Sequence, residues 1–348
     1  MASTLRTLLV WLCAALTIGT AKAEAHEDVN AVDLIFEHVQ DAYEWHITTV
    51  NGHPVAIPLP VIVRSSQRGT WHVFSSSRLA AGRTYEGFHI ATTGDRAGKI
   101  VESGSDGTEQ RPLDLSLTKN ALALVINSLL MLAIFLTVAR WYRRHPKHAV
   151  PGGFVGAVEM LVMSIEDDVI RKSIGPRYAR YSPYLLTAFF FILINNVMGL
   201  LPTFPGGANT TGNIAVTFVL AACTTIAVNV FGSRAYWKDI FWPDVPMWMK
   251  VPVPLMPIIE LFGVISKPFA LMIRLFANIM AGHSVAVALT CLIFITARMG
   301  VAMSAGMTFF SVLLSVFMGC LELLVAYIQA YVFTMLSAIF IGLSQPHE

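Results

Sequence analysis

The sequence predicts an all-α polytopic membrane protein with about five transmembrane helices, the last two long and strongly tilted, plus a small β-rich N-terminal domain. Of its 348 residues 55% are hydrophobic and only 13% charged, whereas an ordinary soluble domain carries about 25% charged residues. The mean hydropathy is +0.61. So few charges cannot cover a globular surface, and lipid must therefore be the solvent for much of the chain.

Residues 1–23 are predicted to be a signal peptide. Arg6 supplies the positive start, Leu8 to Gly19 the apolar stretch, and Ala21-Lys22-Ala23 a cleavage site of the A-x-A type. The alternative is an uncleaved anchor. A mitochondrial transit peptide would be amphipathic and richer in Arg and Ser.

Residues 24–115 have a different composition and are predicted to form a separate extracytoplasmic, periplasmic domain behind the signal peptide. An amphipathic helix is expected over Ala31 to Trp45. Strands and the turns between them are then expected from β-branched and aromatic runs and from Gly-containing turn signals. These are Val61 to Val63, Trp71 to Phe74, His89 to Thr92, Asn51-Gly52 and Gly104-Ser105-Asp106-Gly107. No catalytic constellation occurs in this region.

The chain's cysteines give no sign of a metal or redox site. Cys13, Cys223, Cys291 and Cys320 lie singly, and no pair has the spacing that such sites use. We therefore expect no cofactor and no metal.

Residues 116–348 are predicted to form the membrane domain. Ala121 to Ala139 is long enough to span a ~30 Å hydrocarbon core. Arg140, Arg143, Arg144 and Lys147 follow at once, which marks the cytoplasmic side by the positive-inside rule. The N-terminus is then outside, in agreement with the signal peptide.

Three further segments continue this topology. Phe154 to Lys172 alternates apolar and charged residues and is expected to be a helix on the cytoplasmic surface. Tyr184 to Leu201 would cross outward and Asn213 to Phe231 would return. The cations that follow again mark the cytoplasmic side: Arg234, Lys238 and Lys250.

The last two apolar segments are unusually long. Pro257 to Ala297 and Val301 to Leu343 would each form a helix of about 60 Å, roughly twice the hydrocarbon thickness. Each is either two spans with a hidden turn or one strongly tilted helix. Val301 to Leu343 contains no proline and no polar turn cluster, which favours two tilted helices in a hairpin around Arg298-Met299-Gly300. The C-terminus would be cytoplasmic.

Few ionisable residues interrupt this stretch: Glu260, Lys267, Arg274, His283, Arg298 and Glu322. Each charge near the bilayer centre costs at least ~2.5–3.5 kcal/mol, so such residues are candidates for function. Simpler interpretations exist for some of them. Glu260 and Lys267 could be a snorkelling pair, Arg298 an interfacial residue and His283 a packing residue. Arg274 in mid-span has no comparable alternative.

The spacing of these residues defines two polar faces. Glu260, Lys267 and Arg274 are seven residues apart and share one helix stripe, and Asn278 continues it four residues later. His283 lies about 180° around the helix from Arg274. On the last helix Glu322 and Gln329 also share a face. A pore lined by one stripe would not need the second face.

Three segments form a distinctive set. Ser266 to His283 reads SKPFALMIRLFANIMAGH, Asn196 to Pro202 reads NVMGLLP, and Tyr327 to Phe333 reads YIQAYVF. The first closely resembles the signature of the family of subunit a of F-type ATP synthases, the second is similar to the end of that family's second span, and the third to its last helix. The resemblance covers about residues 118–348 in the family's order.

This resemblance implies a non-catalytic subunit that carries protons through two half-channels to and from the carboxylates of a rotating c-ring. Arg274 would face the ring, accompanied by Asn278 and Gln329. His283, Glu322 and Gln329 would line the outer half-channel, and Glu260, on the stripe that includes Lys267, the inner one. The implied partners are the c-ring, subunit b and membrane lipid, without nucleic acid, in a bacterial inner membrane.

Two departures from some family members are visible. Some carry Glu at the position of His283 and His at that of Glu322, the reverse of this chain; a His–Glu pair can relay protons in either arrangement. Gly199 stands where some members have an acid, which puts a role for that position in doubt.

Two other classes of membrane protein fit the sequence less well. A di-haem cytochrome needs pairs of histidines inside helices, but only His283 lies in a predicted span. An ion-coupled secondary transporter is the stronger alternative, although it would usually show internal repeats and broken helices in both halves. Here the helix breakers Pro257 and Pro268 lie in one helix only. The choice between proton and sodium rests mainly on the c-ring, and His283 favours protons.

Overall fold

The computed structural model describes residues 41–50, 53–91, 96–103, 109–146, 149–201, 206–242, 255–296 and 301–345. The chain divides into two compact units, and each is described by itself. The first comprises residues 1–123, 198–208 and 286–315, and the second residues 124–197, 209–285 and 316–348.

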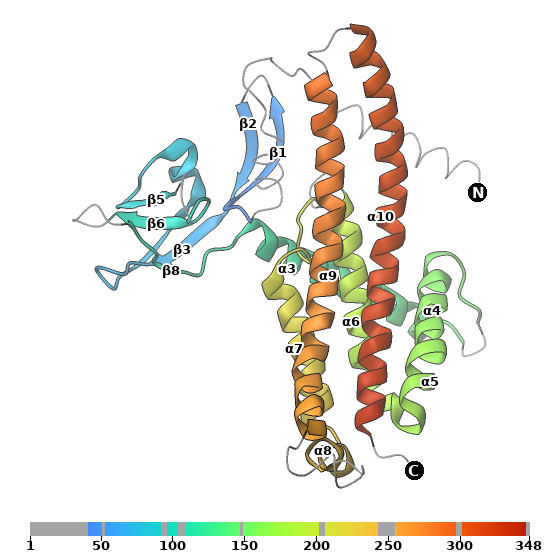
Figure 1. Ribbon diagram of the computed structural model, residues 1–348. Helices are drawn as coiled ribbons and strands as arrows, with labels where there is room; N and C mark the ends of the chain where they lie inside the picture. Colours follow the sequence, from blue (N-terminus) through green and yellow to red (C-terminus); the bar gives the residue numbers. More distant parts are fainter. Residues whose placement is uncertain are drawn as a thin grey trace. The chain divides into compact units, whose positions relative to one another are not determined.

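The first unit contains the β-structure (Figure 1). Its strands are β1 Glu44–Val50, β2 His53–Pro58, β3 Pro60–Arg64, β4 Trp71–Ser75, β5 Phe88–Ile90, β6 Ile100–Ser103, β7 Glu109–Gln110 and β8 Leu113–Asp114. They pair antiparallel as β1-β2, β4-β3-β8 and β5-β6-β7. Inward-facing β-branched and aromatic residues form the core, including Val61, Val63, Phe74 and Phe88. The predicted β-rich domain is confirmed.

One expectation for this region was wrong. Trp45 was assigned to the end of a helix, but Glu44 and Trp45 belong to β1, which pairs with β2 up to Val50 and His53. Strand pairing of this kind is a tertiary contact, which overrides a helical periodicity of only a few residues. The rest of the proposed helix, residues 31–40, lies outside the described residues, as do the turns at 51–52 and 104–108.

The membrane domain is helical, as predicted. Its helices are α3 Lys119–Arg144, α4 Gly153–Ile165, α5 Arg171–Ile174, α6 Tyr178–Leu200, α7 Ile214–Val230, α8 Arg234–Phe241, α9 Leu255–Thr296 and α10 Val301–Ser344. In the part of the chain that the structure describes, four helices are long and apolar enough to cross a membrane. A fifth is added if α7 and α8, bent by 97°, count as one span. This agrees with the expected number of about five.

The predicted surface helix and second span prove to be more continuous than expected. A π-helical turn over Glu166–Ile170 joins α4 to α5, and a short 3₁₀ turn over Gly175–Arg177 leads into α6. The whole stretch Gly153–Leu200 is therefore one helical run of 48 residues that is long and apolar enough to contain a membrane span. Its position relative to the membrane surface stays a prediction.

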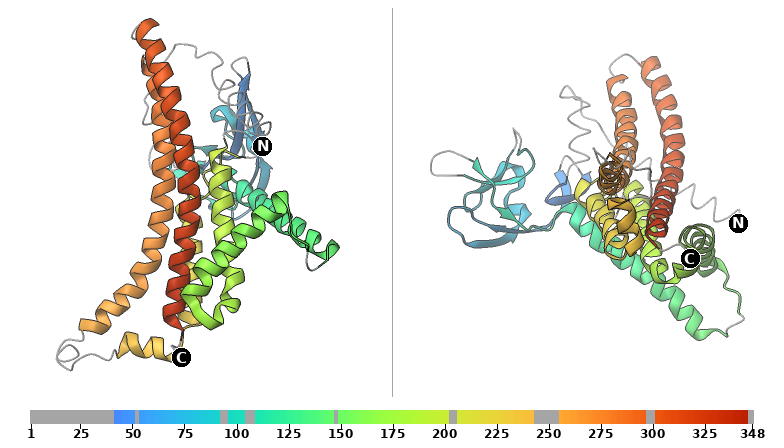
Figure 2. Two further views of the ribbon diagram at one scale, coloured as in Figure 1. Left: turned by 90° about the vertical axis from the view of Figure 1, so that its right-hand side faces the viewer. Right: turned by 60° about the horizontal axis from the view of Figure 1, so that its bottom comes forward.

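The two longest helices, α9 with 42 residues and α10 with 44, are each continuous. Each segment is therefore one long helix, as predicted, and not two spans joined by a hidden turn. They lie side by side in Figures 1 and 2. Their tilt stays a prediction, and the hairpin at 297–300, with Arg298, lies outside the described residues.

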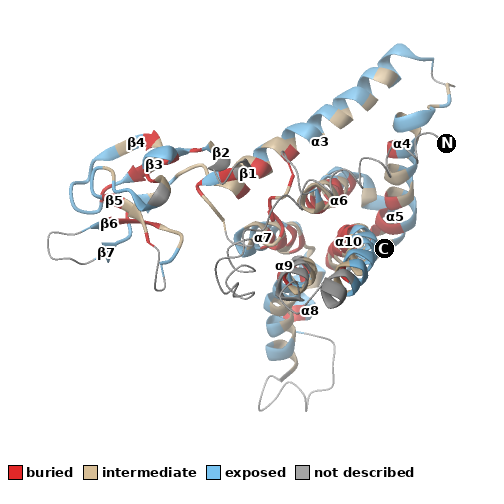
Figure 3. Ribbon diagram, turned by 90° about the horizontal axis from the view of Figure 1, so that it is seen from above, coloured by how far each residue is buried: buried red, intermediate tan, exposed pale blue. Residues whose placement is uncertain are grey.

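The second unit is packed around α6. Leu185, Phe189 and Ile192 of α6 share one apolar cluster with Leu275 of α9 and Phe333 of α10. Figure 3 shows buried residues where α6, α7 and α10 face one another, whereas α3 is largely exposed beyond its first turns. These exposed helix surfaces are apolar, as expected of helices that face lipid.

Candidate functional site

The site begins with a hydrogen bond between the two long helices. Asn278 of α9 donates from Nδ2 to Oε1 of Gln329 on α10, at 2.7 Å. Gln329 is buried, whereas Asn278 is exposed. A buried amide without such a partner would be costly, so this bond sets the register of the pair. Two of the predicted site residues are thus in direct contact.

Glu322 lies about two turns further along the same helix pair. An added Cβ at Gly282 of α9 would lie 3.0 Å from Oε1 of Glu322, so the absence of a side chain there makes room for the carboxylate. That oxygen is buried and has no hydrogen-bond partner among the described residues. His283 follows Gly282 in α9, but its side chain lies outside the described part of the chain.

Arg274 is exposed like Asn278 but, unlike it, has no hydrogen-bond or ion-pair partner among the described residues. Within the described residues nothing forms a hydrogen bond or ion pair with its guanidinium. Ala270 and Ala277, four residues before and three after it, are also exposed and share its helix face. An arginine framed by small residues leaves space for a neighbouring helix to approach closely.

Lys267 and Glu260 lie at the other end of the α9 stripe, and both are half-buried. The ammonium of Lys267 is 5.5 Å from the centroid of the Phe340 ring on α10. Glu260 interacts electrostatically with the phenol of Tyr236, which donates to Oδ1 of Asn229 at 3.1 Å. Among the described residues Glu260 and Lys267 form no ion pair with each other; that their charged ends reach the membrane interface stays an alternative prediction.

A small cavity adjoins Lys267. It has a volume of about 20 Å³ and is lined by residues of α7, α8, α9 and α10 that include Thr224, Asn229, Tyr236 and Phe340. That volume holds about one water molecule. The polar groups around it can supply the hydrogen bonds that a buried water needs.

A buried network of amides and hydroxyls, which the sequence did not predict, connects α3, α6 and the segment before α7. Asn127 Nδ2 and Thr210 Oγ1 both donate to Oδ1 of Asn195 at 2.9 Å. Thr211 Oγ1 donates to Oδ1 of Asn196 at 2.7 Å. The available signal was the pair Asn195-Asn196 inside an apolar helix, because two amides there must find partners within the protein.

The helices and the polar groups together define a multi-pass membrane protein with charged and amide side chains inside its apolar spans. Comparison with known proteins gives the family. The model of the ATP synthase A chain family matches residues 123–342, and the chain belongs to this family, which is the proton-translocating stator subunit of ATP synthase. It is therefore a component of a complex with other ATP synthase subunits.

Curated relatives support this family over most of the chain. ATP synthase subunit a of Chlorobium phaeobacteroides is 41% identical over 240 residues, which is 68% of this chain and 67% of the relative. That of Myxococcus xanthus is 37% identical over 297 residues, 83% of this chain and 88% of the relative. Residues 34–116 match a domain of unknown function, DUF8433.

Proposed function

We propose that this chain carries protons through two half-channels that open on opposite sides of the membrane and meet only through the carboxylates of a rotating c-ring. Arg274 stands between them. One observation carries the proposal: a permanent cation is exposed and unpaired, as far as the structure describes its surroundings, on a helix long and apolar enough to span a membrane.

Such a charge needs a partner from another chain. Facing lipid, the guanidinium would cost several kcal/mol, and no described group of its own chain neutralises it. An approaching carboxylate would be favoured in its ionised form by this cation. Arginine suits the role because it cannot lose its proton in a protein, whereas a buried lysine can. The framing residues Ala270 and Ala277 would let the carboxylate-bearing helix come close.

The remaining polar groups fall on opposite sides of Arg274 along α9. Lys267 precedes it by about 10 Å and Gly282 follows it by about 12 Å, at 1.5 Å per residue. We assign Glu260 and the cavity beside Lys267 to the inner half-channel. We assign Glu322, His283 and Gln329 to the outer one, with Asn278 accompanying Arg274. The separation supports two paths that do not meet within this chain.

The remaining assignments follow from the sequence and belong to the same proposal. Residues 1–23 would be a signal peptide, residues 24–115 a periplasmic domain, and residues 116–348 the membrane domain in a bacterial inner membrane. The C-terminus would be cytoplasmic. The subunit would perform no catalysis and bind no cofactor, and its neighbours would be the c-ring and subunit b.

The substitution Arg274→Ala tests the proposal. It should abolish coupled proton pumping and ATP synthesis, leave the complex assembled, and make the membrane sector passively leaky. Without the cation, a protonated carboxylate could pass between the half-channels without releasing its proton. Arg274→Lys should fail as well, since lysine is a point charge that can be neutralised. The measurements are proton flux and ATP synthesis in vesicles, with the subunit content of the purified complex.

Ile273→Ala is the matched control, because Ile273 is the exposed neighbour of Arg274 on the same helix and carries no charge. It should leave pumping intact. Normal coupled pumping in Arg274→Ala would refute the mechanism, and loss of assembly would assign Arg274 a structural role instead.

A further inference from the structure

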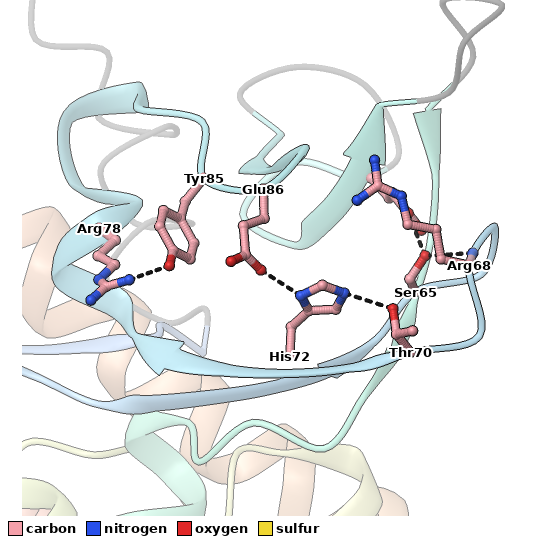
Figure 4. A network of polar contacts seen from close by, with 8 residues as sticks. Ser65, Arg68, Thr70, His72, Arg78, Tyr85 and Glu86 are labelled. Carbon is pink, nitrogen blue, oxygen red and sulfur yellow. Dashed lines mark hydrogen bonds and ion pairs between the residues drawn. The ribbon is translucent and has the colours of Figure 1, made fainter.

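The sheet β4-β3-β8 of the first unit has two different faces. Antiparallel pairing places Arg64 opposite both Trp71 and Leu113, and Ile62 opposite Val73, so these side chains share one face. The other face carries Val61, Val63 and Phe74, which belong to the buried core. His72 of β4 also points to the core side, where it contacts Glu86 and the ring of Phe88 (Figure 4).

The first of these faces is exposed and apolar. Trp71 is 52% exposed, Val73 69%, Leu113 55%, and Leu115, just beyond β8, 61%. Single exposed apolar residues are ordinary, but a contiguous set on one side of a sheet marks an interaction surface. Arg64 lies among them, with its guanidinium carbon 6.0 Å from the centroid of the Trp71 ring.

This face is continuous along the chain with a membrane-spanning helix. Strand β8 ends at Asp114 and α3 begins at Lys119, so four residues, or about 14 Å at full extension, separate them. The link is also held to the sheet: the amide of Leu115 donates to the carbonyl of Ile62 at 2.9 Å, and that of Leu117 to the carbonyl of Pro60 at 3.1 Å. The sheet therefore cannot move far from the point where α3 enters the membrane.

We propose that this apolar face lies on the membrane itself, in the headgroup region where α3 enters. Tryptophan is enriched at that depth because its ring is apolar and its N–H polar. The aliphatic side chains of Val73, Leu113 and Leu115 lose contact with water there, and the Arg64 guanidinium can bind lipid phosphates. The N-terminal domain is then bound to lipid beside the first turn of α3, in whichever leaflet that turn lies.

The test measures depth in the bilayer. The native cysteines are replaced by alanine, a nitroxide is attached at Val73→Cys, and the assembled complex is placed in vesicles of phosphatidylethanolamine and phosphatidylglycerol. Collisions with oxygen, which concentrates in lipid, are compared with those with a water-soluble nickel chelate. Leu115→Cys provides an independent second position. Gln110→Cys, at an exposed position on β7 of the sheet β5-β6-β7, is the matched control.

The expected result is an oxygen-to-nickel ratio several-fold higher at positions 73 and 115 than at position 110. Protection from both reagents at 73 and 115 would show that protein covers the face, either another subunit or residues 24–40 of this chain. Nickel accessibility equal to that of position 110 would show an uncovered face. Either result would overturn the proposal, and neither bears on the role of Arg274.

Discussion

At the scale of single residues, Glu322 is half-buried, and one of its carboxylate oxygens is buried without a hydrogen-bond partner among the described residues. A buried carboxylate oxygen without a partner is unfavourable, and Oε1 of Glu322 has none among the described residues. Water or a proton can supply what is missing, and both occur in a proton path. Gly282 leaves room beside this oxygen, because an added Cβ at that position would crowd it.

Glu322→Gln should therefore slow proton delivery without preventing assembly. The amide keeps the shape of the side chain but cannot accept and release a proton. We expect ATP synthesis in inverted vesicles to fall roughly 100-fold, the lower end of the range for a positioned proton-transfer group, and its pH dependence to change. Glu322→Asp, which keeps the titrating group, should retain more activity. Unchanged rates and pH profile in the Gln variant would make Glu322 a packing residue.

The sequence identified the residues whose burial in lipid is energetically unfavourable, but it did not identify the side chains that contact them. Arg274 and Glu322 could be identified because charges are rare in apolar segments. Asn278 and Gln329 are 51 positions apart, and their contact depends on the register of two consecutive helices, which periodicity alone does not give. Asn195 could not be identified in the same way, because burying an amide costs less free energy than burying a charge. Its partner Asn127 also lies 68 positions away in the chain.

At the scale of elements, length was the reliable signal. About forty apolar residues had to form one long helix or two spans, and α9, despite Pro268 inside it, and α10 are each continuous. The corner between α7 and α8 could not be foreseen. It is held by a tertiary contact, because the amide of Ser233 donates to the carbonyl of Ser344 at 2.8 Å. Locally, the Ser233 hydroxyl caps the start of α8.

The exposed small residues beside Arg274 give a prediction for α9. Ala277→Leu adds bulk on the face where we propose that a helix of the c-ring passes, so it should reduce ATP-driven proton pumping several-fold without unfolding the protein. The same substitution at Ala139, an exposed residue of α3, is the control and should have little effect. Pumping is measured in vesicles at equal content of assembled complex. Equal rates for the two variants would show that nothing approaches Ala277 closely.

Gly342 gives a prediction about stability. A Cβ at this position of α10 would lie 2.1 Å from the backbone carbonyl oxygen of Ser173 in α5, and a backbone atom cannot move aside as a flexible side chain can. Gly342→Val should therefore destabilise the protein by about 1–3 kcal/mol, as overpacking usually does. Thermal unfolding in detergent measures this effect. Gly319→Val on the same helix, where the added Cβ meets nothing within 4 Å, is the control. A similar loss in both variants would point to helix propensity rather than packing.

At the scale of the whole molecule, charge decides orientation. In the second unit the end of α10 is bonded to the start of α6 and to the corner between α7 and α8. Gln345 donates from Nε2 to the Tyr181 hydroxyl at 2.9 Å and to the Phe231 carbonyl at 3.4 Å. The exposed cations Arg180, Arg234 and Lys238 lie on these same elements. They gather at one end of the unit, which by the positive-inside rule supports our proposal that this end is cytoplasmic.

The last prediction follows from this charge distribution and from the single crossing that α3 makes between the β-rich domain and the rest of the chain. In a background without native cysteines, Lys238→Cys should react with a membrane-impermeant maleimide only in inverted vesicles. Gln110→Cys should react only in intact spheroplasts, where the outer surface is accessible. The two positions, both exposed, are each other's control, and disrupting the membrane should make both reactive from either preparation. Labelling of both from one side would contradict a single crossing by α3. A reversed pattern would place the β-rich domain in the cytoplasm and refute the proposed signal peptide, while leaving the family assignment untouched.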